Sequence, residues 1–82
     1  MKRNPEVIVT DLDDELVLLD PKTQRMFTLN ATGRVVWNAL ETHDLDSIAT
    51  QLEEQFEVER SAAQADALAL LDHLRASGLV HD

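Results

Sequence analysis

The stretch MFTLNATGRVVW, residues 26–37, changes from the pattern of a strand to the pattern of a helix within a few positions. Phe27 and Leu29 lie two positions apart, so both face the same side of an extended strand. Beyond Asn30, apolar residues recur at helical spacing instead, and Asn is a good N-cap because its side-chain oxygen accepts from first-turn amides. This junction requires a fold in which a strand leads directly into a helix. The helical stripe consists of Val36, Trp37 and Leu40, and the lone Trp is expected to anchor the core.

The residues before this junction predict two further strands. EVIVTDLDDELVLLD reads as two strands joined by an acidic turn, and its β-branched residues favour extended backbone. LVLLD is a continuous apolar run, which is typical of a strand at the centre of a small sheet. DPKTQR supplies the next turn, with Pro21 in a favourable position. The sequence therefore predicts a three-stranded antiparallel meander whose third strand is MFTL.

Three helices are expected to follow the strands. Asn30 and Asp44 are predicted N-caps of the first two, and Gly33 in the first helix indicates close approach to the sheet. The third helix is predicted from about Ser61 to Ser77, with Gly78 as its C-terminal cap. The expected fold class is α+β, in the order βββααα, and it is similar to a winged helix-turn-helix with the sheet placed first. One domain over residues 1–82 is the expectation for a chain of this length.

Charge and composition exclude several function classes. The chain carries 16 acidic against 7 basic residues, and its net charge of -9 repels nucleic-acid phosphate. It has no cysteine, so it can form neither disulfides nor thiolate metal sites. No apolar run approaches the ~20 residues that span a bilayer, and the start MKRNPEV lacks a signal-peptide core. We therefore expect a cytoplasmic protein that binds neither nucleic acid nor membrane.

No catalytic or metal constellation stands out in the sequence. His43, His73 and His81 are never four positions apart on one helix, so a zinc pair is not indicated. We expect all three on the surface, with His81 at a frayed C-terminal end. The acidic stretches lack the alternating ligands and the turn Gly of a calcium loop. Neither a phosphate-binding Gly loop nor a nucleophile elbow is present, so we expect no catalytic residue, no cofactor and no enzyme activity.

The third helix has a wider apolar face than one neighbour can cover. Leu68 lies about 60° from Leu71 around the helix. Gln64, Asp72 and Arg75 lie on the same flank. If the third strand is a sheet edge beside this helix, the two form a groove that accepts an extended peptide as a fourth strand. The alternative is that the wide face is ordinary core under the first two helices.

Three stretches together resemble the PqqD family. ELVLLDPKTQRMFTLNATGRVVWNAL resembles the first half of the family pattern, with its LLD, Pro turn, aromatic, Leu-Asn and Gly-to-Trp spacing. LDSIATQLEEQFEVE resembles the second helix and its exit, and ADALALLDHLRASGLV resembles the close. The likeness covers roughly residues 6 to 80. Met26 departs from the pattern, because many relatives have Tyr or another aromatic there.

The resemblance implies a peptide-recognition domain that performs no chemistry. Members of this family bind the leader of a ribosomally made, modified precursor peptide, which adds beside the third strand and packs against the third helix. They associate with a modifying enzyme such as a radical SAM protein, or with a leader protease. Exposed sheet edges would also permit a homodimer, but the sequence does not determine the oligomeric state. Carried over to this chain, the implied peptide-binding residues are Arg25, Met26, Phe27, Thr28 and Leu29 on the strand, and Leu68, Leu71, Asp72 and Arg75 on the helix.

Two other functions remain open alternatives from the sequence. One is a winged-helix-like structural or regulatory subunit that binds a folded protein and no peptide. The other, less favoured, is a DNA-binding protein, which would need a basic recognition helix, whereas the second and third helices are acidic overall.

Overall fold

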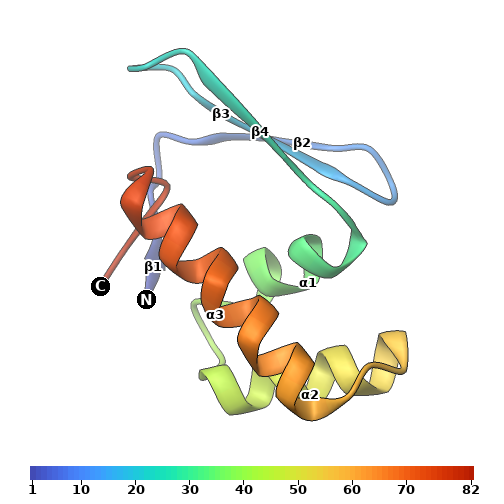
Figure 1. Cartoon of the computed structure of the whole chain (residues 1–82). Helices are drawn as coiled ribbons and strands as arrows, with labels where there is room; N and C mark the ends of the chain where they lie inside the picture. Colours follow the sequence, from blue (N-terminus) through green and yellow to red (C-terminus); the bar gives the residue numbers. More distant parts are fainter.

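The computed structural model describes the chain from residue 1 to residue 82. A three-stranded sheet lies across one side of three helices, and the two chain ends meet beside the end of α3 (Figure 1). The elements, in chain order, are β1 (Lys2–Arg3), β2 (Ile8–Asp11), β3 (Leu16–Asp20), β4 (Arg25–Leu29), α1 (Ala31–Ala39), α2 (Leu45–Phe56), α3 (Arg60–Ala76) and β5 (Val80–His81).

The main sheet is the predicted antiparallel meander, with β3 between β2 and β4. Leu18 of β3 lies opposite both Val9 of β2 and Phe27 of β4, so these three side chains share the face turned to the helices. Leu16 and Leu18 are buried, as expected for the continuous apolar run of a central strand. The predicted α+β order of three strands before three helices is confirmed. The likeness to a winged helix stays a prediction.

A second, two-stranded sheet joins the ends of the chain and was not predicted. β1 pairs antiparallel with β5, which places Lys2 opposite His81 and Arg3 opposite Val80. Leu79 and Val80 are buried in the core, so the C-terminal segment is fixed. The prediction of a frayed end at His81 is therefore wrong. A strand of two residues is too short to show periodicity, so the sequence pattern gives no sign of it.

Trp37 is part of the hydrophobic core, as predicted from its place in the α1 stripe. Its side chain is only 2% exposed, and it belongs to a cluster that includes Leu18, Ile48 and Leu74 from three other elements. The Arg3 guanidinium lies 5.8 Å from the centre of its ring, so the N-terminal strand also covers the Trp. The single Trp thus joins the sheet, the helices and the N-terminal segment.

Asn30 makes the junction between β4 and α1. Its side-chain oxygen accepts from the Gly33 backbone N–H at 2.9 Å and from the Thr32 hydroxyl at 2.9 Å, which confirms the predicted N-cap. A Cβ atom on Gly33 would lie 3.1 Å from the Leu29 Cβ and 3.5 Å from a terminal methyl of Leu70. The glycine therefore lets α1 approach both the end of β4 and α3, as its position in the sequence suggested.

We predict that Asn30→Ala lowers the free energy of unfolding by about 1 kcal/mol, because a first-turn N–H loses its acceptor. Chemical denaturation followed by circular dichroism measures this loss. Asn38→Ala is the matched control, since Asn38 is exposed in the same helix and no side-chain hydrogen bond depends on it. Equal stability of the two variants would contradict the capping role.

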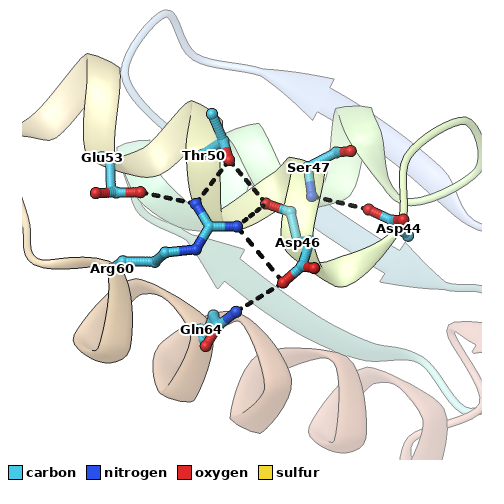
Figure 2. Close-up of polar contacts among 7 residues, drawn as sticks. All are labelled: Asp44, Asp46, Ser47, Thr50, Glu53, Arg60 and Gln64. Atoms are coloured by element: carbon cyan, nitrogen blue, oxygen red, sulfur yellow. Dashed lines mark hydrogen bonds and ion pairs between the residues drawn. The ribbon is translucent and has the colours of Figure 1, made fainter.

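Polar contacts attach the start of α3 to α2 (Figure 2). The Arg60 guanidinium donates to the Glu53 carboxylate at 2.9 Å and to the Thr50 hydroxyl at 2.8 Å. It also donates to the Asp46 backbone carbonyl at 3.2 Å, while the Gln64 amide donates to the Asp46 carboxylate at 2.8 Å. Several shared hydrogen bonds position α3 better than one exposed ion pair would. They fix the rotation of α3 about its own axis.

The two ends of α3 are capped differently. The helix begins at Arg60, one residue before the predicted start, and Glu59 provides no side-chain cap. At its C-terminus Gly78 has a φ of +76°, and the Leu79 N–H donates to the Leu74 carbonyl at 3.0 Å. This is the left-handed glycine cap predicted from the sequence, and it directs Leu79 into the core.

Three carboxylates are held in their charged form by hydrogen bonds. The Arg34 guanidinium on α1 donates two hydrogen bonds to Asp11 of β2 and lowers the pKa of Asp11 below its ordinary value of 3.8. Arg3 does the same for Glu41 and lowers its pKa below 4.5. Asp44 is the predicted N-cap of α2, and a backbone N–H in the first turn lowers its pKa below 3.8. Each contact joins or caps elements of the core.

These shifts predict acid-sensitive stability. A carboxyl group whose pKa is lower in the folded chain stabilises it above the unfolded pKa, and that stabilisation is lost as the pH falls through the folded pKa. We expect stability to fall below about pH 4 and to depend little on these groups between about pH 5 and 7. Thermal melts at several pH values measure this.

Asp11→Asn should reduce stability at neutral pH and shrink the difference between neutral and acid pH. Glu54→Gln, an exposed change on α2 outside every ion pair, should leave that difference unaltered. Both variants remove one negative charge, so each reduces the repulsion among the acidic residues to a similar extent. The difference between them therefore reports on the Asp11–Arg34 contact. An identical pH profile for both variants would contradict the role of the Asp11–Arg34 contact.

Candidate functional site

β4 has a free outer edge. It pairs with β3 on one side, and no other strand pairs with it on the other. Its side chains alternate as predicted: Leu29 is buried and Phe27 half-buried, while Met26 and Thr28 point outward. Met26 is 67% exposed. On such an edge, alternate residues direct their N–H and C=O groups outward, ready to pair with another extended chain.

α3 runs beside β4 in the opposite chain direction. The rings of Phe27 and His73 pack edge to face, with centroids 5.8 Å apart. One helical turn earlier, a methyl group of Leu70 lies over Gly33 in the first turn of α1, four residues beyond the end of β4. We call the outer edge of β4 together with this flank of α3, marked by Leu70 and His73, the strand–helix site. Figure 1 shows α3 passing below the sheet along this line.

A hollow lies at the end of the strand–helix site where β4 gives way to α1. It measures about 250 Å³, and Leu70 and Gly33 form part of its apolar wall. Polar groups reach it from Asn30, already used as a cap, and from Asp66 on α3. A space of this kind suits one apolar side chain of a bound chain. The complete lining is Asn30, Thr32, Gly33, Val36, Leu52, Asp66, Ala67 and Leu70.

The chemistry of the strand–helix site is that of recognition. It combines main-chain hydrogen-bonding groups with aliphatic and aromatic side chains. His73 is exposed, as predicted, but its contact with Phe27 was not foreseen. The signal for it was present, because His73 follows Leu70 by three positions and therefore shares its flank. The chain contains no group of three or more His, Cys, Asp or Glu side chains that could hold a metal ion.

The helix residues proposed from the sequence do not lie beside the strand. Leu68 and Leu70 are separated by about 160° around α3 at 100° per residue, so they occupy opposite flanks. Leu71 faces the core and is nearly buried. Leu68, Leu71, Asp72 and Arg75 line a different hollow, between α3 and the start of α2. The structure therefore brings Arg25, Met26, Phe27, Thr28 and Leu29 together on the free edge, and it separates the four helix residues from them.

The predicted position of those four residues beside the strand is wrong for a physical reason. A wide apolar stripe shows that a helix has two useful flanks, but periodicity does not tell which flank faces a given strand. That choice depends on the rotation set by Arg60, Gln64 and Gly33. Contact of the four side chains with a peptide stays a prediction that the experiments below address.

Comparison with known proteins places the chain in a family. Residues 15–80 match the family described as coenzyme PQQ synthesis protein D, PqqD. The match covers most of the chain, so this chain belongs to the PqqD family. A search of curated proteins found no match.

Two solved structures are similar over nearly their whole length. One is TbiB1 in complex with the TbiA(beta) leader peptide, which is 29% identical with a TM-score of 0.86 over 100% of both chains. The other is lasso peptide synthetase B1 complexed with the leader peptide, which is 32% identical with a TM-score of 0.85. That match covers 99% of this chain and 96% of the other. Both relatives were solved with a leader peptide bound.

No helix of this chain combines the length and the apolar character that crossing a membrane requires.

Proposed function

We propose that this chain binds the leader segment of a ribosomally synthesised precursor peptide and presents the precursor to a modifying enzyme or a leader protease. The observation that carries the proposal is the free edge of β4 beside the Leu70–His73 flank of α3. Membership of the PqqD family supports it, as do the two similar structures whose chains hold leader peptides.

The leader would add to β4 as a fourth strand. Main-chain hydrogen bonds would then supply affinity that depends little on leader sequence, each with a net value of about 0.5–1.5 kcal/mol. An apolar leader side chain in the hollow beside Leu70 would add about 1.5–3 kcal/mol and would supply specificity. Part of this total is offset by the ordering of a flexible peptide. A few good anchors are therefore enough for usable binding.

The strand residues keep the roles predicted from the sequence. Phe27 and Leu29 form the inner wall, and the backbone from Arg25 to Leu29 does the pairing. Met26 is exposed on the outer face of the sheet, so its departure from the family pattern affects the face of the sheet rather than the inner wall. Met adapts its shape easily and tolerates varied neighbours.

Binding of this kind helps catalysis by tethering, and the chain itself performs no chemistry in this proposal. A bound leader keeps the modifiable part of the precursor near the partner enzyme at an effective concentration on the order of mM. The partner would be a separate protein, such as a radical SAM enzyme or a leader protease. With net charge -9, the chain would meet basic partners fastest and would repel nucleic acid. The alternative of a structural subunit without peptide affinity predicts no leader binding at all.

We predict that a leader peptide shifts the backbone amide signals of residues 25–29 most strongly in a ¹⁵N NMR titration. The peptide is the synthetic TbiA(beta) leader, which is bound in one of the two similar structures. New hydrogen bonds to the outer edge of β4 change the environment of those amides directly. Shifts confined to α1 or α2 would contradict strand addition.

We also predict opposite results for two Leu→Lys changes on α3. Leu70→Lys should weaken leader binding at least about tenfold, because the apolar contact beside Gly33 is lost. Leu68→Lys, on the other flank, should change the dissociation constant by less than about twofold. Isothermal titration calorimetry measures both, and circular dichroism checks the fold. His73→Ser, at an exposed position, is a second variant of the strand–helix site and should also weaken leader binding.

The opposite result, in which Leu68→Lys weakens leader binding and Leu70→Lys leaves it unchanged, would place the leader on the flank first predicted from the sequence. It would contradict the strand–helix site.

A further inference from the structure

A second hollow lies on the flank of α3 that faces away from β4. It measures about 310 Å³ and is enclosed by α3, the start of α2 and both ends of the chain. We call it the back hollow. Leu40, Ile48 and Leu71 form its buried floor, and Leu68 stands at its rim with 48% of its surface exposed. The complete lining is Met1, Leu40, His43, Asp44, Leu45, Ile48, Leu68, Leu71, Asp72, Arg75 and Asp82.

The rim of the back hollow is acidic. Three side-chain carboxylates, from Asp44, Asp72 and Asp82, outnumber the two cationic groups of the lining, which are the Arg75 guanidinium and the amino group of Met1. Arg75 already pairs with Asp82 at 3.0 Å and with Asp72 at 3.4 Å. Asp44 stays charged at neutral pH because its carboxylate caps α2, as Figure 2 shows. His43, beside Asp44, is the remaining titratable side chain of the lining. An excess of negative charge thus surrounds an apolar floor.

A leader added along β4 would not reach this hollow. A strand along β4 would contact the flank of α3 that carries Leu70, whereas Leu68 lies about 160° away around the same helix. The body of α3 separates the two sites, so both can be occupied at once. The back hollow is therefore an apolar depression with an acidic rim that a leader bound along β4 would leave free.

We propose that the back hollow docks the protein that receives the peptide, through a segment that presents a large apolar side chain next to Lys or Arg. This inference rests on the proposed function and names the surface for the second partner. The apolar side chain would cover Leu68 and the floor, and the basic neighbours would meet the carboxylates of the rim. A second copy of this chain fits poorly, because two chains of net charge -9 repel each other.

The arrangement gives α3 two partners on opposite flanks. The leader would lie along β4, and the receiving protein would bind at the back hollow. The precursor would then pass from one to the other around a rigid helix of 17 residues. Such a rigid spacer keeps the effective concentration high without a covalent link.

The test uses two synthetic probes, Ac-Lys-Leu-Lys-NH₂ and Ac-Glu-Leu-Glu-NH₂, titrated into the ¹⁵N-labelled full chain. The basic probe should shift the amides of Leu45, Ile48, Leu68 and Leu71 and leave residues 25–29 unchanged. The acidic probe should bind at least about fivefold more weakly, because the rim repels it. Absence of shifts around the back hollow, shifts at residues 25–29 instead, or equal binding of both probes would each overturn the proposal.

Two variants separate this proposal from the leader-binding function. Leu68→Ser should weaken binding of the basic probe by at least about fivefold. Val58→Ser is the matched control, since Val58 is an exposed apolar residue outside both hollows, and it should have no effect. Leu68→Ser should also retain affinity for the TbiA(beta) leader while it loses association with the purified modifying enzyme or leader protease that receives the peptide.

If Leu68→Ser keeps that association, the back hollow is not the docking surface and the leader-binding function stands. If the unaltered chain binds no leader, the proposed function fails, and the probe titration alone reports on the back hollow.

Discussion

The unpaired outer edge of β4 is the constraint on which the rest of the structure depends. An open edge is a hazard for a small protein, because it can pair with any extended chain. Here the edge is only five residues long and begins at the charged Arg25. α3 lies along it and supplies an apolar wall at Leu70 and an aromatic contact at His73. These neighbours give the edge a defined apolar surface, so it can select among the extended chains that could pair with it.

The position of α3 decides what each of its flanks can bind. The contacts of Arg60 and Gln64 with α2 fix its start, and the Gly78 cap and the β1–β5 pairing fix its end. Gly33 sets how closely it approaches the end of β4. With that rotation, one flank carries few charges and faces the strand, and the other is rimmed by carboxylates and faces α2. The two flanks therefore suit chemically different partners.

Local signals in the sequence predicted most of the fold. Asn30, Asp44 and Gly78 mark helix ends because each forms a bond with the backbone a few residues away. The apolar run of β3 indicated a central strand because burial on two sides needs apolar residues throughout. These features depend on near neighbours, which a single sequence contains. The free edge followed from them, since the third strand of a meander has a neighbour on one side only.

The features that escaped prediction depend on distant residues. The pairing of Lys2 with His81 joins the two ends of the chain, and neither strand is long enough to show a pattern. The choice between the Leu68 and Leu70 flanks depends on polar contacts between α2 and α3 that no periodicity encodes. For the same reason the four helix residues proposed from the sequence line the hollow between α3 and α2, whereas the five strand residues lie on the free edge of β4.

Amide hydrogen exchange along β4 tests the central claim most directly. Alternate amides of residues 26–29 already pair with β3, and the others point outward from the edge. If a leader adds as a strand, the outward amides become protected when the peptide is present and return to fast exchange when it is removed. Outward amides that exchange equally fast with and without saturating leader would contradict strand addition at this edge.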